Sequence, residues 1–140
     1  TADWSRNGYR LPTEAEWEFA SRGGALGMGF LYSGSANADD VAWHIATSGG
    51  TTHAVGTKGA NELGIHDMSG NVTEWCWDWY TGYTADAQVD PTGPASGTER
   101  VVRGGASGSI LSHMRCTFRY YVPHPYTSNG LGLRVVLGPR

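Results

Sequence analysis

Two cysteines, Cys76 and Cys116, are the side chains of this sequence best suited to redox or nucleophilic chemistry. They lie far apart and form neither a C-x-x-C motif nor part of a second pair with the spacing of metal ligands. The pattern leaves two alternatives open: a single disulfide in an exported protein, or two inert buried thiols.

The five histidines and one glycine-rich run also match no catalytic motif. No histidine belongs to an H-x-E or H-x-x-x-H pattern, and the sequence holds no G-x-S-x-G elbow. Residues 104–109 are rich in glycine, yet they lack the lysine and the following helix of a phosphate loop. We therefore expect the histidines at the surface or in turns.

Length, charge and composition exclude several classes of protein. A chain of 140 residues is long enough for one core and too short for two. The net charge of -3 offers no basic surface to a polyanion, so we expect no nucleic acid partner. No window approaches the roughly 18 apolar residues of a membrane span, so we expect no membrane span in the visible chain, which also shows no leader.

One helix and a few short strands must position any site, as in an α+β protein. Thr13 and Glu16 form a capping box, and Gly23 and Gly24 follow, which predicts a helix over residues 13–22. With 21 glycines in the sequence, most of the remaining chain is expected to be loop.

Three segments are predicted as strands. Trp75, Trp77 and Trp79 alternate, which predicts a strand with three indoles on one face, directed into the core. Residues 100–103 and 131–137 are predicted as a short strand and a closing strand.

Motifs along the chain together resemble one enzyme family. In order they are R-L-P-T-E-A-E-W-E-F-A-S-R-G-G, N-E-L-G-I-H-D-M-S-G-N-V-T-E-W, D-W-Y, D-P-T-G-P-A-S-G, R-V-V-R-G-G and L-G-L-R-V-V. This series is similar to the formylglycine-generating, or sulfatase-modifying-factor, family. The resemblance implies an irregular, loop-rich variant of the C-type lectin fold with short antiparallel strands, of which residues 1–140 would be the C-terminal portion of a single domain.

The same resemblance implies structural calcium. It places ligands on Asp67 and Glu74 through their carboxylates, and on Gly70 and Val72 through backbone carbonyls. Mixed oxygen ligands around a glycine turn suit a hard cation. The alternative is that both carboxylates only cap turns. Thr73 departs from the family, which has Trp there.

Oxidation of a sulfatase cysteine in this family depends on two cysteines that hold copper. Ser109 stands at the position of the first, and the segment that would carry the second is a few residues shorter and lacks one. Cys116 matches a different, structural cysteine of the family. Because a hydroxyl cannot replace a copper thiolate, we expect no copper and no oxidase activity.

Residues 106–130 have an unusual composition for a surface loop, with no Asp, Glu, Lys, Gln or Trp. Aromatic and small polar side chains mix there without a period, as in a binding paratope. The residues predicted to bind ligand are Ser107, Ser109, Ile110, His113, Phe118, Tyr120, Tyr121, Val122, His124, Tyr126 and Asn129.

Every residue of this segment except Met114 can be reached by randomising the first two bases of an A-A-C codon. The segment thus resembles the variable region of the target proteins of diversity-generating retroelements, which use this lectin-like scaffold. The alternative is an ordinary aromatic loop whose composition arose by chance.

The sequence favours a non-catalytic binding module that displays residues 107–129 as one exposed face. Its expected partner is a protein or cell-surface ligand, and its expected location is extracytoplasmic or at the cell surface. The alternative is an enzyme domain of the sulfatase-modifying class. Ser109 discriminates between them and favours binding.

Overall fold

The helix α1 forms where the capping box predicts it. The computed structural model describes residues 7–138, and α1 spans Glu14–Ser21. Thr13 Oγ1 accepts a hydrogen bond from the Glu16 N–H, while the Glu16 carboxylate accepts one from the Thr13 N–H at 2.8 Å. Gly23 then takes a left-handed conformation with φ of 84° and ends the helix.

The strands and remaining helical turns are short. They are η1 (Gly24–Leu26), α2 (Ala38–Val41), η2 (Leu111–Met114), β1 (Tyr9–Arg10), β2 (Ala42–Trp43), β3 (Ser69–Gly70), β4 (Thr73–Trp79), β5 (Glu99–Arg103), β6 (Arg119–Pro123), β7 (Leu131–Leu133) and β8 (Val136–Leu137). The α+β class is confirmed. No helix among residues 7–138 is long and apolar enough to cross a membrane.

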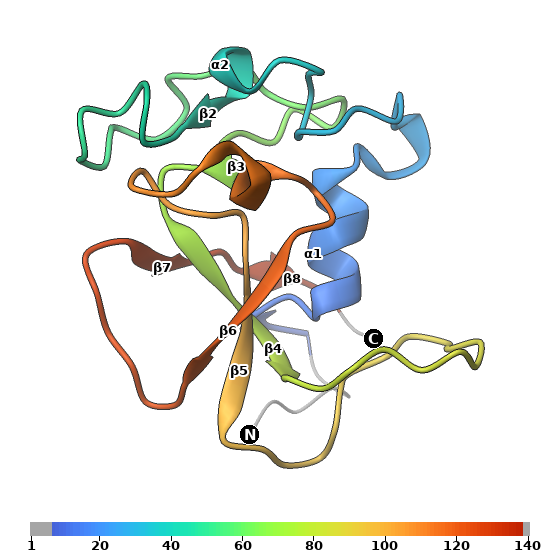
Figure 1. Cartoon of the computed structure of the whole chain (residues 1–140). Coiled ribbons are helices and arrows are strands. Elements are labelled where there is room, and N and C mark those ends of the chain that lie inside the picture. The colour runs from blue at the N-terminus through green and yellow to red at the C-terminus, as the bar shows by residue number, and fades with distance from the viewer. Residues whose placement is uncertain (1–6, 139–140) are drawn as a thin grey trace.

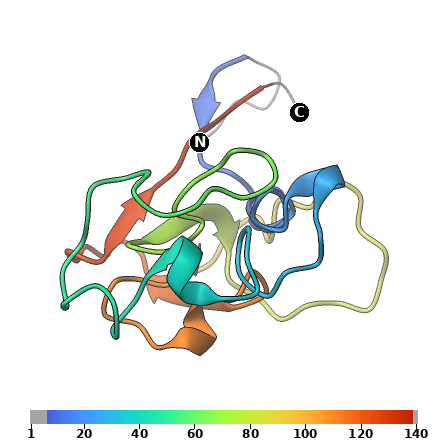
Figure 2. The same ribbon diagram turned by 90° about the horizontal axis from the view of Figure 1, so that it is seen from above.

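The main sheet has the order β6-β5-β4-β7. The pairs β4–β5 and β5–β6 are antiparallel as predicted, whereas β7 runs parallel to β4. The helix α1 packs against β4 and β5 (Figure 1). The loop between β4 and β5 and the loop between β6 and β7 project to opposite sides of the molecule in both views (Figures 1 and 2).

The predicted direction of the three indoles is wrong. In β4 the buried residues are Glu74, Cys76 and Asp78, and the tryptophans that alternate with them are only partly buried. The face turned toward α1 can hold two carboxylates because Trp17 Nε1 and the Glu14 N–H donate hydrogen bonds to them.

The core lies between this face and the helix. Trp17 is 1% exposed and packs with Met68, Cys76 and Val101. A second buried cluster surrounds Met114 and holds Tyr32, Ala38, Val41 and Ala42. Both cysteines are buried free thiols, which selects the second of the two alternatives left by the sequence.

The predicted closing strand over residues 131–137 is interrupted. β7 pairs with β4, whereas β8 pairs with β1 in a separate two-stranded sheet. Between them, the Arg134 guanidinium donates to the Glu74 carboxylate and to the His66 carbonyl oxygen, so the chain changes its partner strand at this point.

Substituting the two kinds of tryptophan separately tests this assignment of the core. We expect Trp17→Ala to lower the free energy of unfolding by about 3–5 kcal/mol, because it empties a fully buried site. We expect Trp75→Ala to cost about 1–2 kcal/mol, because its indole is already partly exposed. Urea denaturation measures both, and equal losses would contradict the assignment.

Candidate functional site

The edge strand β6 carries the centre of the predicted binding segment. It pairs with β5 along its whole length, from Arg103 opposite Arg119 to Glu99 opposite Pro123. Successive side chains of a strand point to opposite faces. Tyr120 and Val122 therefore share the face that is turned away from α1. The residue types of 106–130 show no strand period, yet residues 119–123 form a strand because the pairing with β5 is made by the main chain.

A hollow of about 240 Å³ lies on this face, and we call it the strand hollow. It is bounded by the start of β4, by β5, β6 and β7, and by the segments on either side of β6. Six of the residues predicted to bind ligand line it: Ser109, His113, Phe118, Tyr120, Val122 and Tyr126. Tyr120 is 54% exposed and Tyr126 is 47% exposed, so both are accessible at its rim.

Three of these rings are stacked along one wall. The His113 and Phe118 ring centroids are 4.2 Å apart, and those of Phe118 and Tyr120 are 6.4 Å apart, with interplanar angles of 15° and 10°. Ring contacts of this kind hold large flat side chains in place with little remaining rotational freedom. The wall is therefore aromatic and ordered.

The other predicted residues do not line the hollow. Ser107 is 6% exposed and its carbonyl oxygen accepts from the Ser48 hydroxyl, so its expected place on an exposed face is wrong. Tyr121 does not line the hollow: its ring packs on Tyr80 with centroids 4.3 Å apart, and it also stacks on the Tyr120 ring at 5.3 Å. Residues 107–129 are thus not one face.

Three further predicted residues are exposed but lie beside the hollow. Ile110 precedes η2 and is 55% exposed, and Asn129 lies in the loop before β7. His124 packs edge-on against Trp75 and Trp79, with ring centroids 6.2 Å and 5.8 Å apart. The exposed tryptophan face and the strand hollow therefore belong to the same side of the sheet.

The base of the hollow is formed by the segment Arg103-Gly104-Gly105. Gly105 has φ of 71°, and a Cβ there would come within 2.4 Å of Met114 Cε and 2.9 Å of the His113 carbonyl oxygen. Only glycine fits this close approach. The motif thus brings η2, with His113, against the end of β5.

Comparison with known proteins decides the family. A model of the sulfatase-modifying factor enzyme 1-like domain matches residues 2–138. The chain belongs to this family. The domain is 38% identical over 136 residues to the formylglycine-generating enzyme of Streptomyces coelicolor, covering 86% of this chain and 41% of that protein. It is 40% identical over 157 residues to the chaperone protein LppX of Paenibacillus barcinonensis, covering 97% of this chain and 51% of that protein.

Among solved structures, Treponema denticola variable protein 1 matches this sulfatase-modifying-factor domain with a TM-score of 0.88 at 38% identity. The match covers 95% of this chain and 49% of that chain. The predicted loop-rich, C-type-lectin-like fold is thereby confirmed. The domain spans about half the length of these relatives or less.

The absence of copper stays a prediction, and it concerns Ser109 and the two cysteines. Neither cysteine lines the strand hollow, and burial raises the pKa of both the Cys76 and the Cys116 thiol, which disfavours the thiolate. Ser109, at the position of the first copper cysteine, accepts a hydrogen bond from the Ala106 N–H at 3.1 Å. Its hydroxyl therefore serves the local turn.

The predicted calcium ligands fit that ion only in part. Among residues 7–138, no three His, Cys, Asp or Glu side chains cluster as metal ligands. Both carboxylate oxygens of Glu74 are engaged, because Arg134 donates to them at 2.9 Å and 3.0 Å and Trp17 donates to one of them at 2.7 Å. The Arg134 guanidinium thus already occupies the position beside Glu74 that a calcium ion would need.

Asp67 fits a cation better. It has a positive φ of 59°, and its Oδ2 accepts from the Gly56 N–H at 2.7 Å, while its Oδ1 is buried with no hydrogen-bond partner. Gly70 lies in β3 and Val72 in the bend after it, and a Cβ on Gly70 would lie 2.4 Å from the Trp43 carbonyl oxygen. Calcium stays a prediction, with Asp67 as its best-supported side-chain ligand.

Sequence reasoning missed the part of the site contributed by the other strands. Thr73, Val102 and Leu131 line the strand hollow from β4, β5 and β7. Tyr120 stands opposite Val102, and Thr73 opposite Leu131, so strand register is the pattern that unites them. That register depends on pairing between distant segments. His44 is not at the surface, since it is 2% exposed and contacts Asp39, but its carbonyl oxygen opens the turn at residues 44–47.

Calcium binding is tested by thermal denaturation with and without a chelator. We expect added calcium to raise the melting temperature, because an ion that binds only the folded state stabilises it. Asp67→Asn should abolish this increment. Glu74→Gln should lower the melting temperature by breaking the pair with Arg134 and yet keep the increment. Loss of the increment in Glu74→Gln alone would contradict this division of roles.

Proposed function

We propose that this domain is a non-catalytic ligand-binding module whose binding surface is the strand hollow and its aromatic rim. The observation that carries the proposal is that six of the predicted binding residues gather around one hollow on an edge strand. Main-chain hydrogen bonds hold this strand, so its outward side chains are free for recognition.

The size and lining of the hollow favour a macromolecular ligand. A volume of about 240 Å³ is smaller than the roughly 300–1,000 Å³ of typical small-molecule pockets. It suits one inserted side chain of a protein or cell-surface partner, with Tyr120 and Tyr126 as rigid contacts at the rim. Such a partner agrees with the proposed extracytoplasmic or cell-surface location.

A variable role for residues 106–130 has two supports. The first is their composition, which fits an A-A-C codon randomised at its first two bases at every position except Met114. The second is the similarity to Treponema denticola variable protein 1. We propose that the segment varies in the manner of a diversity-generating-retroelement target, on a scaffold stabilised by calcium.

An enzymatic role is the alternative, since relatives include formylglycine-generating enzymes. Copper-dependent oxidation requires a thiolate ligand that also exchanges with a substrate thiol. The strand hollow offers the Ser109 hydroxyl and the His113 imidazole in its place. Neither group supplies that chemistry.

The absence of oxidase activity can be measured directly. We expect no aldehyde when the protein is incubated with a sulfatase-motif peptide, copper and oxygen, because no thiol faces the strand hollow. A formylglycine-generating enzyme under the same conditions is the positive control. Mass spectrometry detects the aldehyde, and turnover comparable to the control would overturn the non-catalytic proposal.

The binding face should tolerate substitution. We expect Tyr120→Ala and Tyr126→Ala each to cost about 1 kcal/mol of stability or less, because both side chains are exposed and leave no cavity. Thermal denaturation checks this. Loss of folding in the double variant would mean that these tyrosines are core residues.

A display library tests whether the same face can bind. Positions 109, 113, 118, 120, 122 and 126 are randomised and selected against a folded test protein, beside a control library of the exposed positions 51, 52, 54, 55, 56 and 57. We expect specific binders from the first library only. Equal success of both libraries, or failure of the first, would contradict the proposal.

A further inference from the structure

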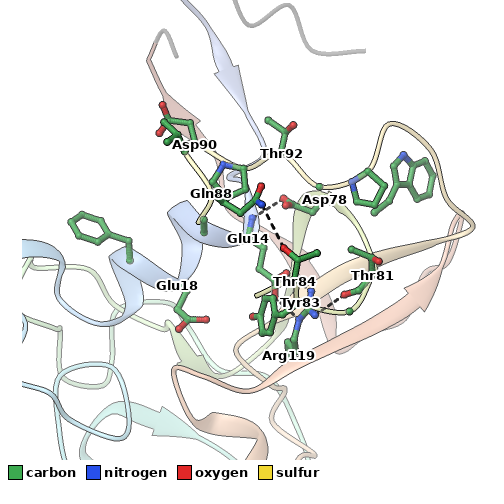
Figure 3. A pocket seen from close by; sticks show the side chains of 18 of the residues that line it. Glu14, Glu18, Asp78, Thr81, Tyr83, Thr84, Gln88, Asp90, Thr92 and Arg119 are labelled. Atoms are coloured by element: carbon green, nitrogen blue, oxygen red, sulfur yellow. Dashed lines mark hydrogen bonds and ion pairs between the residues drawn. The ribbon is translucent and has the colours of Figure 1, made fainter. Parts of the chain in front are cut away.

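A second and larger hollow, of about 810 Å³, lies between α1 and the loop that joins β4 to β5. We call it the helix hollow. Figure 3 shows Glu14, Asp78, Tyr83 and Arg119 gathered at its centre, with Asp90 at the rim. It shares no lining residue with the strand hollow. Its volume lies within the range of pockets that enclose small molecules.

The arginines of the helix hollow are already engaged. Arg119 donates to both Glu14 oxygens at 2.8 Å and 2.5 Å and to the Thr81 carbonyl oxygen at 2.7 Å, and it lies over the Tyr83 ring. Arg22 donates to Glu18 through Nε at 2.9 Å. Each of these guanidiniums has a carboxylate partner, so an anionic ligand would have to displace Glu14 or Glu18.

The carboxylates are divided differently. Glu14 and Glu18 are neutralised from one side by Arg119 and Arg22 and from the interior by Arg103. Asp78 has no ion pair with any described residue, although it is 6% exposed. Its Oδ2 accepts from the Glu14 N–H at 2.7 Å, and its own main-chain N–H also interacts with the carboxylate. A buried carboxylate without a cation is costly unless it is protonated or a cation arrives.

Burial, aided by the nearby Glu14 charge, raises the pKa of Asp78 to about 6, against the lowering effects of the Glu14 N–H and the Arg119 charge. The remaining walls mix polar side chains, among them Thr84 and Gln88, with exposed apolar and aromatic ones. Phe19 is 61% exposed, Tyr83 is 72% exposed and Val89 is 90% exposed. Exposed aromatic rings beside an unpaired carboxylate are the surroundings that attract an organic cation.

We propose that the helix hollow binds a small organic cation, a primary ammonium on an aromatic or apolar body. Asp78 would hold the ammonium, with Asp90 at the rim as a second unpaired carboxylate, and the body would lie against Tyr83 and Phe19. This activity goes beyond the proposed function, because it uses other residues on another side of the molecule.

The affinity for such a cation depends on pH with a definite sign. Below about pH 6 Asp78 is protonated and offers no charge, so binding weakens as the pH falls. The charged and titratable groups that face Asp78 are Glu14 and Glu18 of α1, Arg100 of β5, Arg119 of β6, and Tyr83 and Asp90 of the loop. The variant Asp78→Asn cannot titrate at this position, so any pH dependence of binding that it keeps comes from the neighbouring groups.

Benzylamine and its neutral analogue benzyl alcohol are suitable probes, because they share one shape and differ in charge. Titration calorimetry at pH 7.5 should show saturable binding of benzylamine and binding of benzyl alcohol that is weaker by about tenfold or more. At pH 5, where Asp78 is mostly protonated and benzylamine stays charged, its affinity should fall about tenfold. Equal affinities for both probes would overturn the proposal.

Matched variants locate the site. Asp78→Asn should weaken benzylamine about tenfold and remove the pH dependence, whereas Asp86→Asn, outside the hollow, should change neither. Tyr83→Ala should weaken binding, whereas Tyr9→Ala, with a similarly exposed ring at 75%, should not. If Asp78→Asn fails to fold, the pH profile of the unaltered protein and the comparison of Tyr83→Ala with Tyr9→Ala still test the proposal. Unchanged affinity in Tyr83→Ala, together with a flat pH profile, sinks the proposal and leaves the strand hollow untouched.

Discussion

A buried guanidinium, that of Arg103, connects parts of this domain that also meet in the apolar core around Trp17. It donates to Glu14 and Glu18 of α1 and to the Cys116 carbonyl oxygen, so it connects the helix, β5 and the segment that leads to β6. Removing both Glu14 and Glu18 would leave the Arg103 charge buried and unpaired, which is strongly destabilising. Arg103 therefore helps to position the helix, the sheet and the binding segment relative to one another.

Both hollows follow from this connection. The helix hollow exists because α1 is held over the inner face of β4, where Asp78 reaches the first turn of the helix. The strand hollow exists because the same anchor fixes the end of β5, from which Gly104 and Gly105 turn the chain toward η2. One strand, β6, contributes Arg119 to the first hollow and Tyr120 to the second.

What could be predicted from sequence is what depends on neighbours along the chain. The capping box of Thr13 and the strand at residues 100–103 are local, and both predictions are confirmed. The alternation of residues in β4 correctly indicated two faces. The hydrophobicity of the tryptophans, however, predicted the wrong face as the buried one. Glu74 and Asp78 occupy the inner face because Arg134 and the α1 backbone, both distant in sequence, satisfy them. The helix hollow escaped prediction for the same reason.

The pair of Arg119 and Glu14 has a consequence for the alignment of β6. An edge strand whose outward residues change freely has little to prevent a shift by one residue, which would exchange its two faces. Arg119 lies at the first position of β6 and is bound at both Glu14 oxygens, so a shifted strand would lose this ion pair. Arg119, an inward residue, thus fixes the register of β6, and the outward residues can change without affecting that register.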